Sequence, residues 1–315
     1  MNRKLRTFPP SVLRLAVTGA VLASLLAFPL PGRAQVQSSE ILYVADVDDR
    51  ASAAVRKTTA NGRETTLISR CFADGARYCT FHDPVLSPNG KRVALVVNHV
   101  SEDGNNFAVW ISALNGSGAK MVTPASSSRV FRPAWTRYGR NKNNQDDLLA
   151  YQAGNQILQV NLCDDALPAR GRLVATGTSP SYSPDGLWLG YQSGGNIWKV
   201  RNSGSGATMV AGTSLVEGYP RWSKSSMVEK IVFLRRLSTG WKLYTMNADG
   251  SGVTPKVIVG ADTTDPDAAV LPNAFAWEQD GDVHIQIGTD APEPLKLDAH
   301  DPVWGHGTNS GASCM

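Results

Sequence analysis

The chain has 315 residues, with 31 lysines and arginines against 27 aspartates and glutamates and a formal net charge of +4. Residues 1–34 contain five of the basic residues and none of the acidic ones, so the remainder has 26 basic and 27 acidic residues and a balance of −1. This balance gives no reason to expect a nucleic-acid or anionic-membrane partner, and we expect neither.

The N-terminus has the pattern of an export signal. Basic residues at positions 3, 4 and 6 precede a mostly apolar run from Leu15 to Leu30, followed by small residues at Gly32 and Ala34. The run is too short for a stable membrane span, and Gly32 and Ala34 match the −3 and −1 positions of a signal-peptidase site. We predict a signal peptide over 1–34, cleaved after Ala34. The predicted mature chain, 35–315, is periplasmic or secreted and has no lipid anchor or membrane span.

The predicted mature part begins with three short strand-like runs, over 41–47, 52–59 and 64–68, with Asn61 and Gly62 as the turn before the last. Strands of 4–8 residues bounded by such turn residues are typical of all-β folds. No inner strand for the same sheet precedes these runs. We interpret them as the second, third and fourth strands of a sheet.

The four cysteines would enter an oxidising compartment, where disulfides persist. They are Cys71, Cys79, Cys163 and Cys314. Four cysteines allow three pairings. Cys71 and Cys79 flank a short turn-like loop, so we predict that they are paired, and the pairing of Cys163 and Cys314 stays open.

The predicted disulfide loop contains Phe72, Arg77 and Tyr78. Aromatic residues and arginine are favoured at the cores of protein interfaces. One interpretation is therefore an element that contacts a partner, and the other is simple stabilisation of a long connection.

A proline motif recurs along the rest of the chain, with successive spacings of 49, 47, 40, 46 and 36 residues. Its prolines are Pro84, Pro133, Pro180, Pro220, Pro266 and Pro302. A period of this size indicates a propeller or a solenoid. After each proline motif except the last come three further strand-like runs, of which the middle one alternates apolar and polar residues. These middle runs are 107–112, 156–161, 196–201, 241–247 and 282–288.

Turn signals separate these alternating strands from a short fourth strand. Asn115, Ser203 and Asp249 each begin a turn that continues with Gly-Ser-Gly, and we interpret these turns as hairpins and not as phosphate loops, because each connects two strands. The polar stretch over 138–147 is predicted to be an extended surface loop. Four antiparallel strands per repeat make one propeller blade.

The two ends of the chain complement each other. The sixth proline motif, at Pro302, has almost no chain after it, while the N-terminal strands lack an inner strand. Pairing these segments would close the ring and remove exposed sheet edges. We therefore predict a single all-β domain over 35–315, a six-bladed β-propeller, and a monomer.

The repeat resembles that of TolB-type propellers in the WD-like repeat superfamily. The resemblance lies in the run 179–200, in the run 84–95 and in the outer turn 247–252. It implies an exported six-bladed propeller with protein partners in the cell envelope, such as a peptidoglycan-associated lipoprotein. Unlike in TolB, we expect no α/β domain before the propeller. Unlike in prolyl oligopeptidases, we expect no hydrolase domain after it.

The residues immediately before the six prolines should surround one mouth of the central channel, because inner strands line that channel. They are Asp83, Arg132, Ser179, Tyr219, Asp265 and Asp301. Two of the motifs share the sequence His-Asp-Pro-Val, beginning at His82 and at His300. This cluster could coordinate a divalent cation or bind a cationic or hydroxyl-rich ligand. Alternatively, aspartate before proline caps a turn.

No catalytic motif accompanies the cluster. The sequence has no Gly-x-Ser-x-Gly elbow, and His99, His284 and His306 lie at no spacing typical of a catalytic base or a metal motif. We expect Trp110, Trp135, Trp198, Trp222, Trp241 and Trp304 to pack blades and not to bind carbohydrate. The predicted function is a non-catalytic module that binds an envelope protein or acts as a scaffold, without a cofactor. The alternative is a metal-dependent ligand binder or an enzyme of lyase or hydrolase type that uses the Asp and His cluster.

Overall fold

The computed structural model describes residues 40–47, 52–59, 63–72, 78–102, 104–136, 147–163, 166–223, 229–258, 260, 262–268, 274–288, 291–296 and 298–304. Several predicted features lie outside these ranges: the signal peptide, the turn at 61–62, the loop predicted from residue 138 up to residue 146, Arg77, His306 and Cys314. Among the described residues, no helix is long and apolar enough to cross a membrane.

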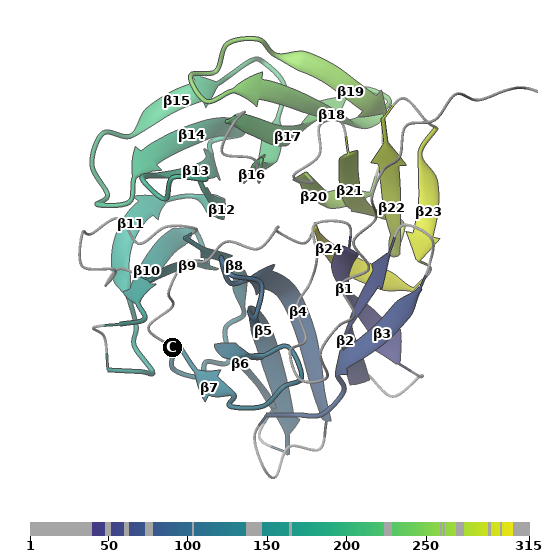
Figure 1. Cartoon of the computed structure of the whole chain (residues 1–315). Helices are drawn as coiled ribbons and strands as arrows, with labels where there is room; N and C mark the ends of the chain where they lie inside the picture. Colours follow the sequence, from purple (N-terminus) through teal and green to yellow (C-terminus); the bar gives the residue numbers. More distant parts are fainter. Residues whose placement is uncertain are drawn as a thin grey trace, which may run out of the picture. The chain divides into compact units, whose positions relative to one another are not determined.

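The described residues form six four-stranded antiparallel sheets arranged in a ring around a central axis (Figure 1), which confirms the predicted six-bladed all-β propeller. The first strand of each sheet faces the channel. These inner strands are β4 (Tyr78–Leu86), β8 (Val130–Trp135), β12 (Thr178–Tyr182), β16 (Glu217–Trp222), β20 (Thr263–Ala268) and β24 (Ala299–Trp304). The second strands are β5 (Arg92–Ser101), β9 (Leu148–Ala153), β13 (Trp188–Ser193), β17 (Lys230–Leu237), β21 (Ala274–Gln279) and β1 (Glu40–Val47).

The third strands contain the alternating runs predicted from the sequence. They are β6 (Gly104–Ala113), β10 (Gln156–Asn161), β14 (Asn196–Arg201), β18 (Gly240–Asn247), β22 (Asp282–Ile287) and β2 (Ser52–Thr59). The outer strands are shorter: β7 (Lys120–Met121), β11 (Arg172–Thr176), β15 (Thr208–Ala211), β19 (Thr254–Ile258), β23 (Glu293–Lys296) and β3 (Glu64–Ile68). In β22 buried and more exposed side chains alternate along the strand, because Val283 and Ile285 are buried and their neighbours are not.

The last blade combines the two ends of the chain. Its strand order is β24-β1-β2-β3, and Ile41 pairs with Trp304 while Ala45 pairs with Ala299 (Figure 1). The predicted closure is therefore confirmed. Because this closing blade lies between β4 and β20, each inner strand has a neighbour on both sides around the channel.

A β-bulge occurs in every inner strand at its proline. In β4, for example, the step from His82 to Val85 faces the shorter step from Val96 to Ala94, so one extra residue is accommodated. Proline cannot donate to the sheet ladder, and a bulge is one of the few places in a sheet that tolerates it. The residue before the proline has a left-handed φ between 45° and 56° in all six strands. Such backbone costs about 1–3 kcal/mol per non-glycine residue, so the ring of blades must hold it in place.

Tryptophans pack between the blades, as expected from the repeat. Trp135, Trp222, Trp241 and Trp304 are at most 9% exposed, and Trp110 and Trp198 are partly buried. Asp147, at the end of the segment predicted as a loop, is buried and accepts a hydrogen bond from the Trp135 indole. These side chains stabilise the packing of one blade against the next.

The predicted disulfide between Cys71 and Cys79 is present, with the two Cα atoms 5.7 Å apart. Phe72 in the same loop packs against Phe81 and Trp110, with ring centroids 5.7 and 5.6 Å away. Its side chain therefore extends the hydrophobic core. Cys163 is also disulfide-bonded.

Candidate functional site at the channel mouth

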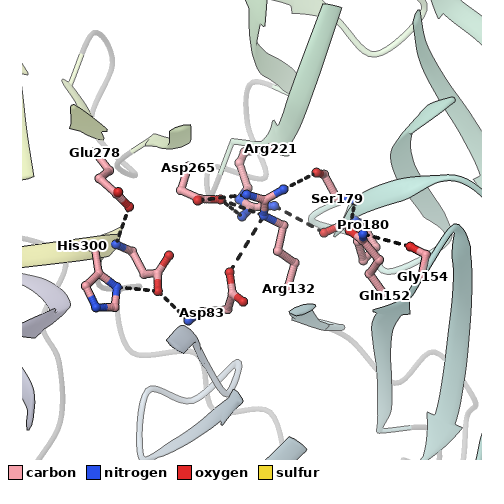
Figure 2. A network of polar contacts seen from close by, with 11 residues as sticks. Asp83, Arg132, Gln152, Gly154, Ser179, Pro180, Arg221, Asp265, Glu278 and His300 are labelled. Carbon is pink, nitrogen blue, oxygen red and sulfur yellow. Dashed lines mark hydrogen bonds and ion pairs between the residues drawn. The ribbon is translucent and has the colours of Figure 1, made fainter. Parts of the chain in front are cut away.

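The bulges place the six residues that precede the prolines at one level of the channel. Figure 2 shows side chains from opposite blades meeting there in one network of polar contacts. A cavity of about 90 Å³ adjoins this level. Its charged lining consists of Asp83, Asp265, Asp267, Asp301, Arg132 and Arg221. The structure thus brings together the six residues that precede the repeated prolines. We call these six residues, together with the polar side chains that contact them, the channel mouth.

Arg132 spans the channel mouth. It comes from β8, and its Nε and Nη2 atoms donate to the two carboxylate oxygens of Asp265, at 3.0 and 3.1 Å (Figure 2). Asp265 comes from β20, the blade on the far side of the ring. A two-point contact between guanidinium and carboxylate fixes both distance and orientation. The ion pair therefore acts as a strut across the channel.

Other mouth residues hold this strut. Arg132 Nη1 donates to Ser179 Oγ at 2.8 Å, and the guanidinium lies 4.6 Å from the ring centroid of Tyr219. Arg221 Nη2 donates to the same Asp265 carboxylate at 3.3 Å. Burial by itself would lower the pKa of Arg132, but Asp265 and Asp83 reverse this effect and raise it. Arg132 is therefore held as a permanent cation in the channel.

The two His-Asp-Pro-Val motifs lie on neighbouring inner strands, β4 and β24, and their aspartates have different surroundings. Asp301 Oδ2 accepts the backbone N–H of Asp83 at 2.7 Å and lies 2.8 Å from His300 Nδ1. Asp83 has one oxygen 3.8 Å from Arg132 Nε, and its buried Oδ2 atom has no hydrogen-bond partner. The Asp301 carboxylate is therefore well supplied with polar contacts, whereas the Asp83 carboxylate is not.

The acidity of the two aspartates follows these contacts. Burial, the nearby Asp301 and, to a smaller extent, Asp265 raise the pKa of Asp83 to about 7, against the opposing effect of Arg132. Burial also acts to raise the pKa of Asp301, but the His300 hydrogen bond and charge and the Asp83 N–H outweigh it and lower the pKa. Asp301 is the charged member of this pair, and Asp83 is the member that takes up a proton first.

The two histidines of these motifs stack on each other, with ring centroids 5.6 Å apart and an interplanar angle of 25°. His82 Nε2 lies 2.9 Å from Thr80 Oγ1. Burial and the positive charges of Arg129 and His300 lower the pKa of His82 to about 4, despite the opposing charge of Asp301. His82 is therefore a neutral imidazole near pH 7.

Sequence reasoning missed three residues of the network. Arg221 directly follows one of the repeat prolines, and its charge at a channel-facing position was the available signal. Glu278 Oε2 lies 3.4 Å from the backbone N of Asp301, and Gln152 Oε1 accepts the backbone N–H of Ser179 at 3.0 Å (Figure 2). Gln152 and Glu278 are the fifth residues of β9 and β21, so a recurring polar residue at that strand position could have revealed them.

The electrostatics of the mouth favour positively charged groups. Four carboxyl groups, those of Asp83, Asp265, Asp301 and Glu278, face two guanidinium groups, those of Arg132 and Arg221. Burial and the charges of Asp301 and Asp265 raise the pKa of Glu278, with His300 opposing them. The raised pKa values of Asp83 and Glu278 therefore reflect their burial first and the neighbouring carboxylates second.

Sequence comparison finds no matching protein-family model and no matching curated protein. Solved structures do match. The TolB of Acinetobacter baumannii superposes with a TM-score of 0.61 at 15% identity, over 85% of this chain and 67% of the TolB chain. A chain from a nidogen–laminin complex has a TM-score of 0.61 at 8% identity, over 84% of this chain and 97% of that one.

A puromycin hydrolase has a TM-score of 0.54 at 13% identity, and the match covers 86% of this chain and 54% of the hydrolase chain. At these identities the likeness shows the fold alone. The six-bladed propeller is therefore shared with TolB and with other propellers, including a hydrolase, and function has to be argued from the site.

Proposed function

We propose that this chain is an exported β-propeller that binds an envelope protein or acts as a scaffold, through the face at which the inner strands begin. The observation that carries the proposal is the combination of a fixed charged mouth and exposed apolar side chains on one face. Tyr78, at the start of β4, is 37% exposed. Leu215 and Val216, directly before β16, are 41% and 46% exposed. Tyrosine and arginine are enriched at the cores of protein interfaces, and a partner would also cover the exposed apolar side chains of Leu215 and Val216.

The charge of the mouth indicates the chemistry of the partner. An excess of carboxyl groups over guanidinium groups suits a segment with lysine or arginine side chains. Asp83 is especially suited because its side chain is only 8% exposed and its Oδ2 atom lacks a donor. A cationic side chain from a partner would supply that donor and the missing positive charge.

The comparisons support binding without proving it. The match to the nidogen–laminin structure covers nearly all of the matched chain, so a chain little larger than this propeller takes part in that complex. The envelope location in this proposal rests on the predicted signal peptide.

The contacts of Ser179 do not suit the role of a serine nucleophile. Ser179 is the serine among the six residues that precede the prolines, and its Oγ accepts a hydrogen bond from Arg132. A serine nucleophile needs a base within hydrogen-bond reach. Among the hydrogen bonds of the described residues, none joins Ser179 Oγ to a histidine or a carboxylate.

Site-specific photo-crosslinking in the native host tests the proposal. A photoreactive residue would replace Val216 at the mouth or, as a matched control, Val253, which is 40% exposed in the turn between β18 and β19. Strand directions alternate within a blade, so this turn lies at the other end of the channel. We expect one discrete protein adduct from position 216 and none from position 253. Equal adducts from both positions, or none from position 216, would overturn the proposal.

A further inference from the structure

We propose that His82, His300 and Asp301 form a binding site for Zn²⁺ or a similar divalent transition metal, between the first and the last inner strands of the ring. One nitrogen of each imidazole and one carboxylate oxygen of Asp301 lie within 4.8 Å of one another. The two rings face each other at 5.6 Å. The site is a separate inference from partner binding, because it depends on these three side chains alone.

The ligand set suits this class of metal. Imidazole nitrogen is a preferred ligand of Zn²⁺, Ni²⁺ and Cu²⁺, whereas Ca²⁺ and Mg²⁺ prefer oxygen. A tetrahedral ion with bonds of about 2.0–2.2 Å sets its ligand atoms roughly 3.4 Å apart. The cluster therefore has to contract by about an ångström, which side-chain rotation of His82 and His300 can provide.

Neighbouring groups already orient two of the three ligands. Thr80 Oγ1 lies 2.9 Å from His82 Nε2, and when Nε2 carries the proton this contact leaves the Nδ1 lone pair available. The backbone N–H of Asp83 holds Asp301 Oδ2 at 2.7 Å. Such outer contacts orient metal ligands and increase their basicity. The side chains of His300 and Asp301 are 19% and 11% exposed, so the site is sheltered but still open to solvent.

The site has two physical consequences. Three protein ligands leave one coordination position for water or for a group from another molecule. The ion would also cross-link β24 to β4, where the C-terminal inner strand lies beside the first complete blade. Metal bound only to the folded chain therefore stabilises the ring by mass action.

The test uses untagged, exported protein that has been treated with a chelator and then titrated with Zn²⁺ and with Co²⁺. We expect one ion per chain, a rise in the midpoint of thermal unfolding, and a visible absorption spectrum for the Co²⁺ form. His82→Gln and His300→Gln should each weaken binding by about tenfold or more, and Thr80→Val by about tenfold. His284→Gln is the matched control, because His284 stacks on Trp277 in another blade, and it should bind as the unaltered chain does.

Three results would overturn the proposal: no saturable binding by the unaltered chain, undiminished binding by His82→Gln, or an equal loss with His284→Gln. If His300→Gln does not fold, His82→Gln and Thr80→Val still decide the outcome. Photo-crosslinking at Val216 is read separately, so failure of the metal site and failure of partner binding can be distinguished.

Discussion

Two neighbouring inner strands carry the same four residues, His-Asp-Pro-Val, yet their aspartates are in opposite electrostatic states. In β24, Asp301 receives the N–H of Asp83 and contacts His300 Nδ1, and its pKa is lowered against the effect of burial. In β4, Asp83 keeps one buried oxygen without a partner, and its pKa is raised. The difference shows that the shared motif alone does not decide how each carboxyl group behaves, because the contacts that the two aspartates make with their neighbouring blades differ.

Removing the cation beside Asp83 should have the largest effect. Arg132→Met leaves the buried Asp265 carboxylate with Arg221 as its remaining ion-pair partner, so the free energy of unfolding should fall by about 3–5 kcal/mol in denaturant titrations. Asp265→Asn in the same chain should recover part of this loss, because position 265 then no longer carries a buried charge that has lost its two-point contact with Arg132. A double variant no more stable than Arg132→Met would contradict the account of the strut.

The two histidines give an intermediate effect and test the comparison directly. In metal-free protein, His300→Gln should lower the free energy of unfolding by about 1.5–3 kcal/mol, because it removes a hydrogen bond to a charged carboxylate. His82→Gln should cost only about 0.5–1.5 kcal/mol, because its ring contacts the neutral hydroxyl of Thr80. Equal losses of unfolding free energy in the two variants, measured by chemical denaturation, would contradict the predicted difference between the two motifs.

The outer edge of the closing blade provides a smaller, pH-dependent effect. Glu64 lies 2.5 Å from both Lys296 Nζ and Arg56 Nη1. The hydrogen bond from Lys296 is the largest cause that lowers the pKa of Glu64 to about 2, with burial opposing it and Tyr43 and Arg56 assisting. A lowered carboxyl pKa stabilises the fold above the ordinary value near 4.5, and this contribution is lost as the pH falls through about 2.

Glu64→Gln should therefore lower the free energy of unfolding by about 1 kcal/mol at pH 7, after allowance for solvent screening of a side chain that is 27% exposed. The difference from the unaltered chain should shrink as the pH falls toward 2. Unfolding midpoints measured across that pH range check the sign, and a difference that grows on acidification would exclude this role for Glu64.

Much of the fold could be predicted from the sequence because each blade repeats its own local chemistry. Alternating residues such as Val283 and Ile285 mark a half-buried strand, and each repeated proline marks the bulge of an inner strand. The closure of β24 onto β1 followed from an incomplete blade at each end of the chain. These features depend on short segments or on counting blades.

The contacts of the mouth could be predicted only in part. The positions before the prolines were identified, but the pairing of Arg132 with Asp265 depends on which blades face each other across the channel. Glu278 escaped notice because its partner belongs to the next blade. The difference between Asp83 and Asp301 was also hidden, since their flanking residues are identical. Local sequence does not specify such contacts between blades.

The central claim is that contacts between neighbouring blades set the role of each aspartate, and a paired substitution tests it most directly. Asparagine tolerates the left-handed backbone found at both positions, so Asp301→Asn and Asp83→Asn differ mainly in the side-chain hydrogen bonds and charge interactions that they remove. In metal-free protein near pH 7, we predict that Asp301→Asn lowers the free energy of unfolding by about 2 kcal/mol, while Asp83→Asn leaves it unchanged or raises it. Equal losses in the two variants, or a larger loss for Asp83→Asn, would contradict the claim.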